Sequence, residues 1–347
     1  MHESAPPSTI AKVPRPHTMK LSSPGKQRLP WGAWLNRLGP MLGLAAIYAL
    51  FTAFGPEGFA SRGNMETIAR QTAVVGTAAL GMTMVIIVGG IDLSVGSIIA
   101  LSTVTIALLL AKGLNPFVAA LGGILAGMVC GLLNGAIITR LRVVPFIVTL
   151  GTLLGVRGIA KGLANEQKVD APMTWLNDLL SALPPDRRWM IVPPGVWAML
   201  ILAVVVGIVL HRARFGRHIF AIGSNEQTSR LSGIDVQHVK LLVYSISAGF
   251  AGLAGLMQFS RLTVGDPTAA SGLELDVIAA VVIGGGSLSG GQGSVFGALI
   301  GALIMTVIRS GCSQIGYPNW RQEIITGTII VIAVALDRLR HRRAHQT

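Results

Sequence analysis

Val85-Ile-Ile-Val-Gly-Gly-Ile-Asp-Leu-Ser-Val-Gly-Ser97 is an apolar run that ends in a glycine pair and continues into Leu-Ser and then Gly-Ser. The same order of residue types returns in Val281-Val-Ile-Gly-Gly-Gly-Ser-Leu-Ser-Gly-Gly-Gln-Gly-Ser294. Glycine lacks a Cβ atom and so favours turns and close backbone contacts over helix interiors. Each stretch is therefore predicted to hold a helix, a glycine break and the start of a new helix.

The composition around these stretches indicates a membrane protein. Of the 347 residues, 51% are hydrophobic and 12% are charged, against about 25% charged in soluble domains. This excludes a soluble enzyme, a disordered regulator and a disulfide scaffold. The net charge of +13 accompanies long apolar runs, so we expect the basic residues in loops rather than on a nucleic-acid surface. Cys130 and Cys312 show no metal-ligand spacing.

Apolar runs of about 20 residues can cross a hydrocarbon core about 30 Å thick. The clear candidates are 38–54, 66–89, 94–111, 116–138, 144–163, 191–210, 241–260 and 322–337. Residues 276–309 are also apolar, but glycines 284–286 and 290–291 break them. They are predicted to form two more segments, one of them short or re-entrant. The predicted fold is an all-α polytopic membrane protein with about ten transmembrane helices, while eight or nine also fit the pattern.

Several glycines recur at four-residue spacing within these segments. They are Gly127, Gly131 and Gly135, Gly151 and Gly155, and Gly297 and Gly301. Small residues at this interval let helix backbones approach closely in lipid. We therefore interpret these glycines as helix-packing positions.

The basic residues predict the orientation and the domain limits. Of the 28 Lys and Arg residues, 17 lie in 1–37, 140–142, 211–240 and 338–343, which the positive-inside rule assigns to the cytoplasm. Both termini are then cytoplasmic. The expected organisation is a disordered basic tail at 1–37, one transmembrane domain at 38–340 with a cytoplasmic loop at 211–240, and a short cytoplasmic tail at 341–347.

The outer loop at 164–190 is long enough to hold a short amphipathic helix around Trp175–Leu180. Two interpretations stay open for this loop: contact with an external partner, or a solvated connector.

Ionisable and polar side chains inside the apolar runs are few, and each is costly unless it faces protein or water. Asp92 lies between a glycine pair and Ser94, where it could cap a helix, line a pathway, or do both. Asn134, Arg157, Glu274 and Asp276 are the other candidates. For Arg157 the alternative is a side chain that extends to the outer interface. For Glu274 and Asp276 it is stabilisation of a helix dipole.

The inner loop contains a recognisable short helix. Asn225 or Ser224 can cap a helix over about 225–232, and Gly233 can end it. A helix displayed on the inner face suggests a docking partner, and a plain connector is the alternative. The chain has no phosphate-binding Gly-x-x-x-x-Gly-Lys-Ser/Thr loop, so we expect no ATP hydrolysis by this chain itself.

Four ordered motifs then suggest a family. They are Gly90-Ile-Asp-Leu-Ser-Val-Gly-Ser97, the segment from Gly223-Ser-Asn to Leu231-Ser-Gly-Ile234, Glu274-Leu-Asp-Val-Ile-Ala-Ala280 and the Gly284–Ser294 stretch. Together they resemble the permease (transmembrane) subunit of bacterial ATP-binding-cassette (ABC) sugar importers of the ribose/xylose type, a binding-protein-dependent transport system component of the inner membrane. The resemblance covers about 38–340. The chain departs from the family's usual residues at Leu273, where Tyr is frequent, and at Ser310-Gly311-Cys312, where Asn-Gly-Leu is frequent. These departures leave the identity of the sugar open.

The resemblance implies partners and roles for specific residues. Two permease copies would form the channel in the lipid bilayer, two cytoplasmic ABC ATPase domains would dock below it, and a periplasmic sugar-binding protein would deliver the cargo. ATP would bind to the ATPase, so no cofactor, metal, catalytic residue or nucleic acid is expected for this chain. The coupling residues implied are Gly223, Asn225, Glu226, Arg230, Leu231 and Gly233. Those of the translocation path or gate are Asp92, Ser94, Ser97, Asn134, Glu274, Asp276, Gly285, Ser287 and Ser289.

Three other functions compete with sugar import. The same architecture could carry branched-chain amino acids or nucleosides, but the Gly-Ile-Asp-Leu-Ser motif favours sugar. An ion-coupled secondary transporter would show a similar repeat of broken helices, but the inner helix and the few intramembrane carboxylates argue against it. The polar, glycine-broken centre argues against a membrane scaffold that transports nothing.

Overall fold

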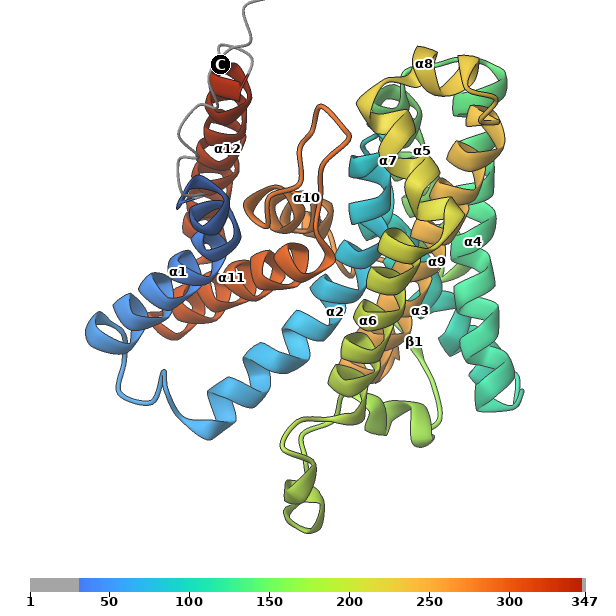
Figure 1. The fold of residues 1–347 in the computed structure, drawn as a ribbon. Coiled ribbons are helices and arrows are strands. Elements are labelled where there is room, and N and C mark those ends of the chain that lie inside the picture. The colour runs from blue at the N-terminus through green and yellow to red at the C-terminus, as the bar shows by residue number, and fades with distance from the viewer. Residues whose placement is uncertain (1–30, 345–347) are drawn as a thin grey trace, which may run out of the picture.

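The computed structural model describes the backbone of residues 31–344 and the side chains of 39–187 and 189–335. These residues form twelve α-helices, two short 3-10 helices and one pair of two-residue strands (Figure 1). The first six helices are α1 (Trp31–Phe54), α2 (Arg62–Ile87), α3 (Val95–Ala111), α4 (Pro116–Arg140), α5 (Pro145–Leu163) and α6 (Pro194–Arg212). The others are α7 (Arg214–Ser224), α8 (Glu226–Leu231), α9 (Val236–Leu262), α10 (Leu273–Ile283), α11 (Val295–Gln314) and α12 (Asn319–Ala344).

Every predicted apolar segment coincides with a helix. The stretch at 276–309 forms two helices, α10 and α11, and α10 is short at 11 residues, so the prediction of a broken segment is confirmed. Six helices, α2, α4, α5, α6, α9 and α11, are long and apolar enough to cross a membrane. The chain is an all-α, multi-pass membrane protein.

The predicted tails need correction. Residues 31–37 of the tail predicted at 1–37 belong to α1, while residues 1–30 lie outside the described residues. At the other end, α12 continues to Ala344, so only 345–347 of the second predicted tail lie outside them.

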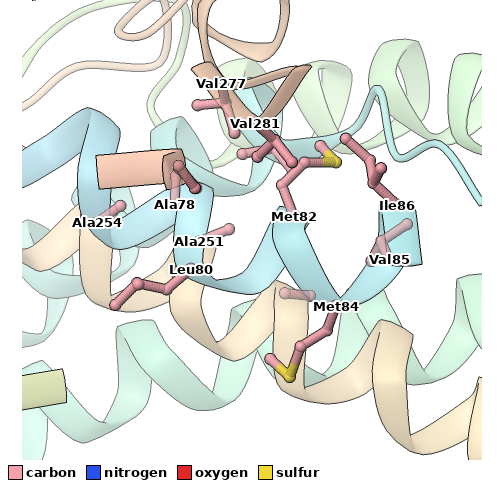
Figure 2. Packing of buried hydrophobic residues seen from close by; sticks show 14 of the residues in the cluster. Ala78, Leu80, Met82, Met84, Val85, Ile86, Ala251, Ala254, Val277 and Val281 are labelled. Atoms are coloured by element: carbon pink, nitrogen blue, oxygen red, sulfur yellow. The ribbon is translucent and has the colours of Figure 1, made fainter. Parts of the chain in front are cut away.

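The long helix α2 forms the centre of the fold. All of its side chains from Thr72 to Ile87 are buried, because α6, α9, α10 and α11 pack around it. Figure 2 shows Val277 and Val281 of α10 beside Met82 of α2. By contrast, α4, α5 and α6 expose apolar side chains such as Leu132, Leu154 and Val204, as expected for helices that face lipid.

Glycine determines how closely α4 approaches α9. A Cβ atom on Gly131 would collide with the carbonyl oxygen of Tyr244 and with the Ala248 side chain, and one on Gly127 would meet the Ala248 carbonyl at 2.6 Å. The packing interpretation therefore holds for these glycines. It is wrong for Gly151 and Gly155, because no described atom lies within 4 Å of a Cβ placed there.

The outer loop folds back onto the ends of the helices. Strand β1 (Val169–Asp170) pairs antiparallel with β2 (Val264–Gly265). The helix predicted near Trp175–Leu180 is the 3-10 helix η1 (Trp175–Leu179), with a capping box between Thr174 and Asn177. A second 3-10 helix, η2 (Pro185–Met190), follows it. Figure 1 shows this loop in light green at the end of the molecule opposite α8.

Arg157 ties α5 to the loop that precedes α10. Its Nη1 atom donates hydrogen bonds to the backbone carbonyls of Pro267, at 3.1 Å, and Ala269, at 2.6 Å. The guanidinium is therefore held by backbone carbonyls of this loop.

The two glycine environments predict opposite effects of one substitution. Gly131→Ala should destabilise the protein by about 1–3 kcal/mol, because the added methyl group overpacks the contact between α4 and α9. Gly151→Ala should be neutral or slightly stabilising, because the site is open and alanine favours a helix over glycine by about 1 kcal/mol. Thermal unfolding of the detergent-solubilised variants measures both. Equal losses would contradict the close approach of α4 and α9.

Candidate functional site

The two glycine-broken stretches of the sequence meet in space. The backbone N–H of Gly291 donates a hydrogen bond of 2.8 Å to the carbonyl of Ile87, the last residue of α2. A Cβ atom on Gly290 would lie 3.1 Å from the Cα atom of Gly89. Both glycines have positive φ angles, +86° at Gly290 and +85° at Gly89, which disfavour other residues. The pattern of the sequence therefore marks one structural junction, which we call the glycine junction (87–92 and 284–294).

The second half of the glycine junction is a compact turn. The carbonyl of Ser287 accepts a hydrogen bond from the backbone N–H of Gly290, at 2.9 Å, and its hydroxyl accepts one from that of Ser289, at 3.2 Å. Gly285 has a φ of +93°. Three predicted path or gate residues, Gly285, Ser287 and Ser289, thus shape this turn, and Ser287 is buried.

Gly223, near the end of α7, lies directly against both halves of the glycine junction. A Cβ atom on Gly223 would collide with the carbonyl oxygen of Ile87 and would lie 2.6 Å from the backbone nitrogen of Gly291. Only a residue without a side chain fits this contact. The inner segment therefore touches the predicted gate through backbone atoms.

The predicted helix of the inner loop is present as α8. The Asn225 side chain accepts a hydrogen bond of 2.8 Å from the backbone N–H of Thr228, and Gly233 after the helix has a φ of +83°. The expected capping by Asn225 and ending at Gly233 are therefore confirmed. The helix end carries Leu231, whose side chain is 90% exposed. Figure 1 shows α8 at one extreme of the molecule.

The helix before α8 is absent from the sequence prediction. α7 buries Gly216, Ile219 and Ile222 along one side. The signal was available, because Phe215, Ile219 and Ile222 follow the four-then-three spacing of an amphipathic helix.

Charged side chains hold α8 on α9. Glu226 forms ion pairs with Lys240 at 2.6 Å and with Arg230 at 3.0 Å. The hydrogen bond from Lys240 is the main cause that lowers the pKa of Glu226 below its usual value, with Arg230 adding to the effect. A lowered pKa means that this carboxylate stabilises the fold at neutral pH and that the stabilisation is lost as the pH falls through the lowered value.

Asp92 belongs to a buried polar cluster with Ser94 and Asn134. Its Oδ1 atom accepts hydrogen bonds from the backbone N–H of Ser94, at 2.8 Å, and from the Ser94 hydroxyl, at 2.6 Å. Asn134 donates from Nδ2 to the same hydroxyl at 3.0 Å. All three side chains are fully buried. Ser94 occupies the N-cap position of α3, and Asp92 accepts a hydrogen bond from the free backbone N–H of that residue, as the capping interpretation of Asp92 requires.

The remaining predicted path residues lie away from this cluster. The Ser97 hydroxyl donates to the carbonyl of Leu153 at 2.7 Å and so joins α3 to α5. Glu274 and Asp276 lie in the first turn of α10. Asp276 pairs with Arg309 of α11, with 2.6 Å between the carboxylate and guanidinium atoms. Asp276 also lines a polar cavity of about 610 Å³ between α2, α9, α10, α11 and α12.

The sequence interpretation missed two arginines of this cavity, Arg261 and Arg309. Each is a charged residue near the end of an apolar run, and that isolation was the signal that could have identified them. Within the side chains described, no group of three or more His, Cys, Asp and Glu is arranged to hold a metal ion.

Comparison with known proteins gives one consistent family. Residues 64–334 match the family model described as branched-chain amino acid transport system / permease component. The ribose import permease protein of Escherichia coli (strain K12) is 38% identical over 305 residues, covering 88% of this chain and 94% of the relative. That of Bacillus subtilis (strain 168) is 38% identical over 314 residues, 90% of this chain and 96% of the relative.

A third relative is named for a different sugar. The D-allose transport system permease protein of Escherichia coli (strain K12) is 36% identical over 326 residues, which cover 93% of this chain and 98% of the relative. No solved structure matches the chain.

The buried cluster predicts that the protein loses stability when the Ser94 hydroxyl is removed. Ser94→Ala removes the hydroxyl that both Asp92 and Asn134 contact, while Asp92 keeps the backbone N–H of residue 94, so we expect a loss of about 1–3 kcal/mol in stability. Ser232→Ala is the matched control, because its exposed hydroxyl donates only to the Thr228 carbonyl. Thermal unfolding in detergent compares the two variants. If Ser94→Ala unfolds at the wild-type temperature, the three side chains do not form the cluster.

Proposed function

The chain belongs to the family described as branched-chain amino acid transport system / permease component, and from this premise we propose that it is the membrane-spanning subunit of an ATP-driven monosaccharide importer. One observation carries the choice of cargo. Relatives that align with about nine-tenths of this chain are named for ribose and D-allose. The chain is thus a transport component, and its substrate is moved rather than converted.

Branched-chain amino acids are the second candidate cargo, because the description of the family model names them. The individual relatives favour a sugar over this candidate, since their similarity extends over nearly the whole length of both chains. A nucleoside cargo or an ion-coupled mechanism has no comparable support.

The proposed importer has three kinds of partner. A cytoplasmic ABC ATPase binds and hydrolyses ATP, so that this chain needs no cofactor. A periplasmic binding protein delivers the sugar, and a second permease copy, identical or related, completes the channel in the lipid. The exposed α8 and its Leu231 support a docking site for the ATPase, because a 90% exposed leucine at the end of a short helix is available to a partner.

We propose ten spans in the bacterial inner membrane, with both termini in the cytoplasm and one transmembrane domain over 38–340. The six long apolar helices and the shorter apolar helices at 39–54 and 95–111 support this number in part. The basic residues of the inner loops support the orientation. Figure 1 adds that the C-terminal end of α12 and α8 lie at the same end of the molecule.

The mechanism follows from the contact at Gly223. Movement of the ATPase shifts α8, and α7 moves with it, because only Asn225 separates the two helices. Gly223 then bears on Ile87 and Gly291 together, so one displacement acts on both halves of the glycine junction. Packed helices switch between discrete arrangements rather than deforming smoothly. In this proposal the first broken segment is held by Asp92, Ser94, Ser97 and Asn134. The second is formed by Gly285, Ser287 and Ser289.

The cargo is tested by uptake into proteoliposomes that hold this chain with its ATPase and binding protein. We expect ATP-dependent uptake of at least one sugar from a panel of D-ribose, D-xylose, D-allose and L-arabinose. L-leucine, adenosine and an imposed ion gradient without ATP serve as the competing conditions. Uptake of leucine but of no sugar would show that a branched-chain amino acid, the second candidate, is the cargo. Uptake driven by the ion gradient without ATP would contradict the ATPase partner.

Leu231→Asp tests the role of α8. A charge placed in an apolar docking contact should lower ATP-dependent uptake at least about ten-fold, as for a central interface residue. The variant leaves the pairs of Glu226 with Lys240 and Arg230 intact, so α8 keeps its place. Leu141→Asp is the control, since Leu141 is exposed on another inner turn. Normal uptake by Leu231→Asp at equal amounts in the membrane would exclude docking through α8.

A further inference from the structure

A polar cavity lies in the half of the membrane domain that faces away from α8. It has a volume of about 610 Å³, within the range of about 300–1,000 Å³ for small-molecule sites. Its polar walls include Asn64, Gln71, Gln258, Arg261, Asp276 and Arg309. These side chains come from α2, α9, α10 and α11, so the cavity is formed by four helices that are distant in sequence.

Some residues that line this cavity also carry polar atoms behind its wall that lack protein partners. Asp276 is fully buried, and its Oδ1 atom has no hydrogen-bond partner within the described part of the chain. The same holds for the Nε atoms of Arg261 and Arg309. These covered atoms are out of reach of a ligand, whereas the Arg309 side chain is 40% exposed and lines the cavity, so its guanidinium is open to a ligand.

The charges and the functional groups of the walls indicate the class of that ligand. The ion pair between Asp276 and Arg309 neutralises the only carboxylate among the lining residues and one of their two arginines. What remains are amide, hydroxyl and guanidinium groups, which offer donors and acceptors side by side. A sugar hydroxyl is both a donor and an acceptor, so a neutral polyhydroxyl compound can pair with the guanidinium, amide and hydroxyl groups of the wall together.

We propose that this cavity binds the sugar in transit through its hydroxyl groups, with Arg309, Arg261 and Gln258 as the contact residues and Asp276 holding Arg309 in place from behind the wall. The inference rests on the proposed sugar-import function and adds a binding site within the permease itself. None of the lining residues is aromatic, and aromatic rings bring the largest buried areas to a site. Binding is therefore weak, which suits a site from which the sugar must leave.

Protection of a single thiol tests the site directly. In full-length protein with Cys130→Ser and Cys312→Ser, Ser313→Cys places a thiol on the wall of the cavity. Its rate of modification by N-ethylmaleimide is measured in nanodiscs with increasing D-ribose, D-xylose, D-allose or L-arabinose. We expect at least one sugar to slow the reaction in a saturable manner. Ala182→Cys on the exposed outer loop should react at an unchanged rate.

Two further variants assign the protection to the proposed contacts. With the Ser313→Cys reporter, Arg261→Gln and Gln258→Leu should each raise the half-protecting sugar concentration about ten-fold, the loss expected for one hydrogen bond to a charged or buried group. Neither change removes a member of the ion pair between Asp276 and Arg309. Unmodified protection in both variants would overturn the assignment.

Failure of this inference is separable from failure of the proposed function. If proteoliposomes with the ATPase and binding protein import a sugar but that sugar gives Ser313→Cys no protection, the cavity is not its binding site and the importer function stands. If no sugar is imported, the function itself fails. Protection by D-gluconate but by no neutral sugar would also overturn the inference, because the cavity would then recognise an anion through Arg261.

Discussion

The backbone hydrogen bond between Gly291 and Ile87 is the constraint on which the centre of the structure depends. A broken helix exposes backbone N–H and C=O groups, and within a membrane these groups need protein partners because lipid offers none. Here the end of α2 and the turn before α11 supply partners to each other. Such a contact requires backbones without side chains, which is why Gly89, Gly290 and Gly223 converge there.

The same constraint explains the position of α7 and α8. Gly223 can reach the Ile87 carbonyl only if α7 lies flat against the glycine junction, and the buried Ile219 and Ile222 fix it in that position. α8 lies at the end of α7 and is held by Glu226 and Lys240. The docking contact that we propose for α8 is thereby linked to the glycine junction through one short helix, since only Asn225 separates α7 from α8.

Features that depend on local sequence were predictable, whereas features that depend on tertiary partners were not. The apolar runs gave every long helix, and Asn225 and Gly233 gave α8, because capping acts within a few residues. The glycines of α4 and α5 have the same spacing, yet Gly127 and Gly131 of α4 pack against α9 while Gly151 and Gly155 of α5 meet no described atom, since spacing does not reveal what lies opposite. Asp276 and Arg309 pair across two helices, so neither residue identifies the other from the sequence.

The two halves of the domain differ in what must change for cargo to pass. The half that faces away from α8 holds a cavity lined by Asp276 and Arg309. In the proposed mechanism the glycine junction closes the half nearer to α8. Because glycines meet there without interlocking side chains, separating Gly291 from Ile87 breaks mainly a backbone hydrogen bond, which costs about 0.5–1.5 kcal/mol net where water replaces the partner and about 1–3 kcal/mol where the groups stay buried. A junction of larger side chains would also lose buried contacts of several kcal/mol. In the proposed mechanism, glycine at this place therefore gives a turn that a displacement of α7 can open without separating interlocked side chains.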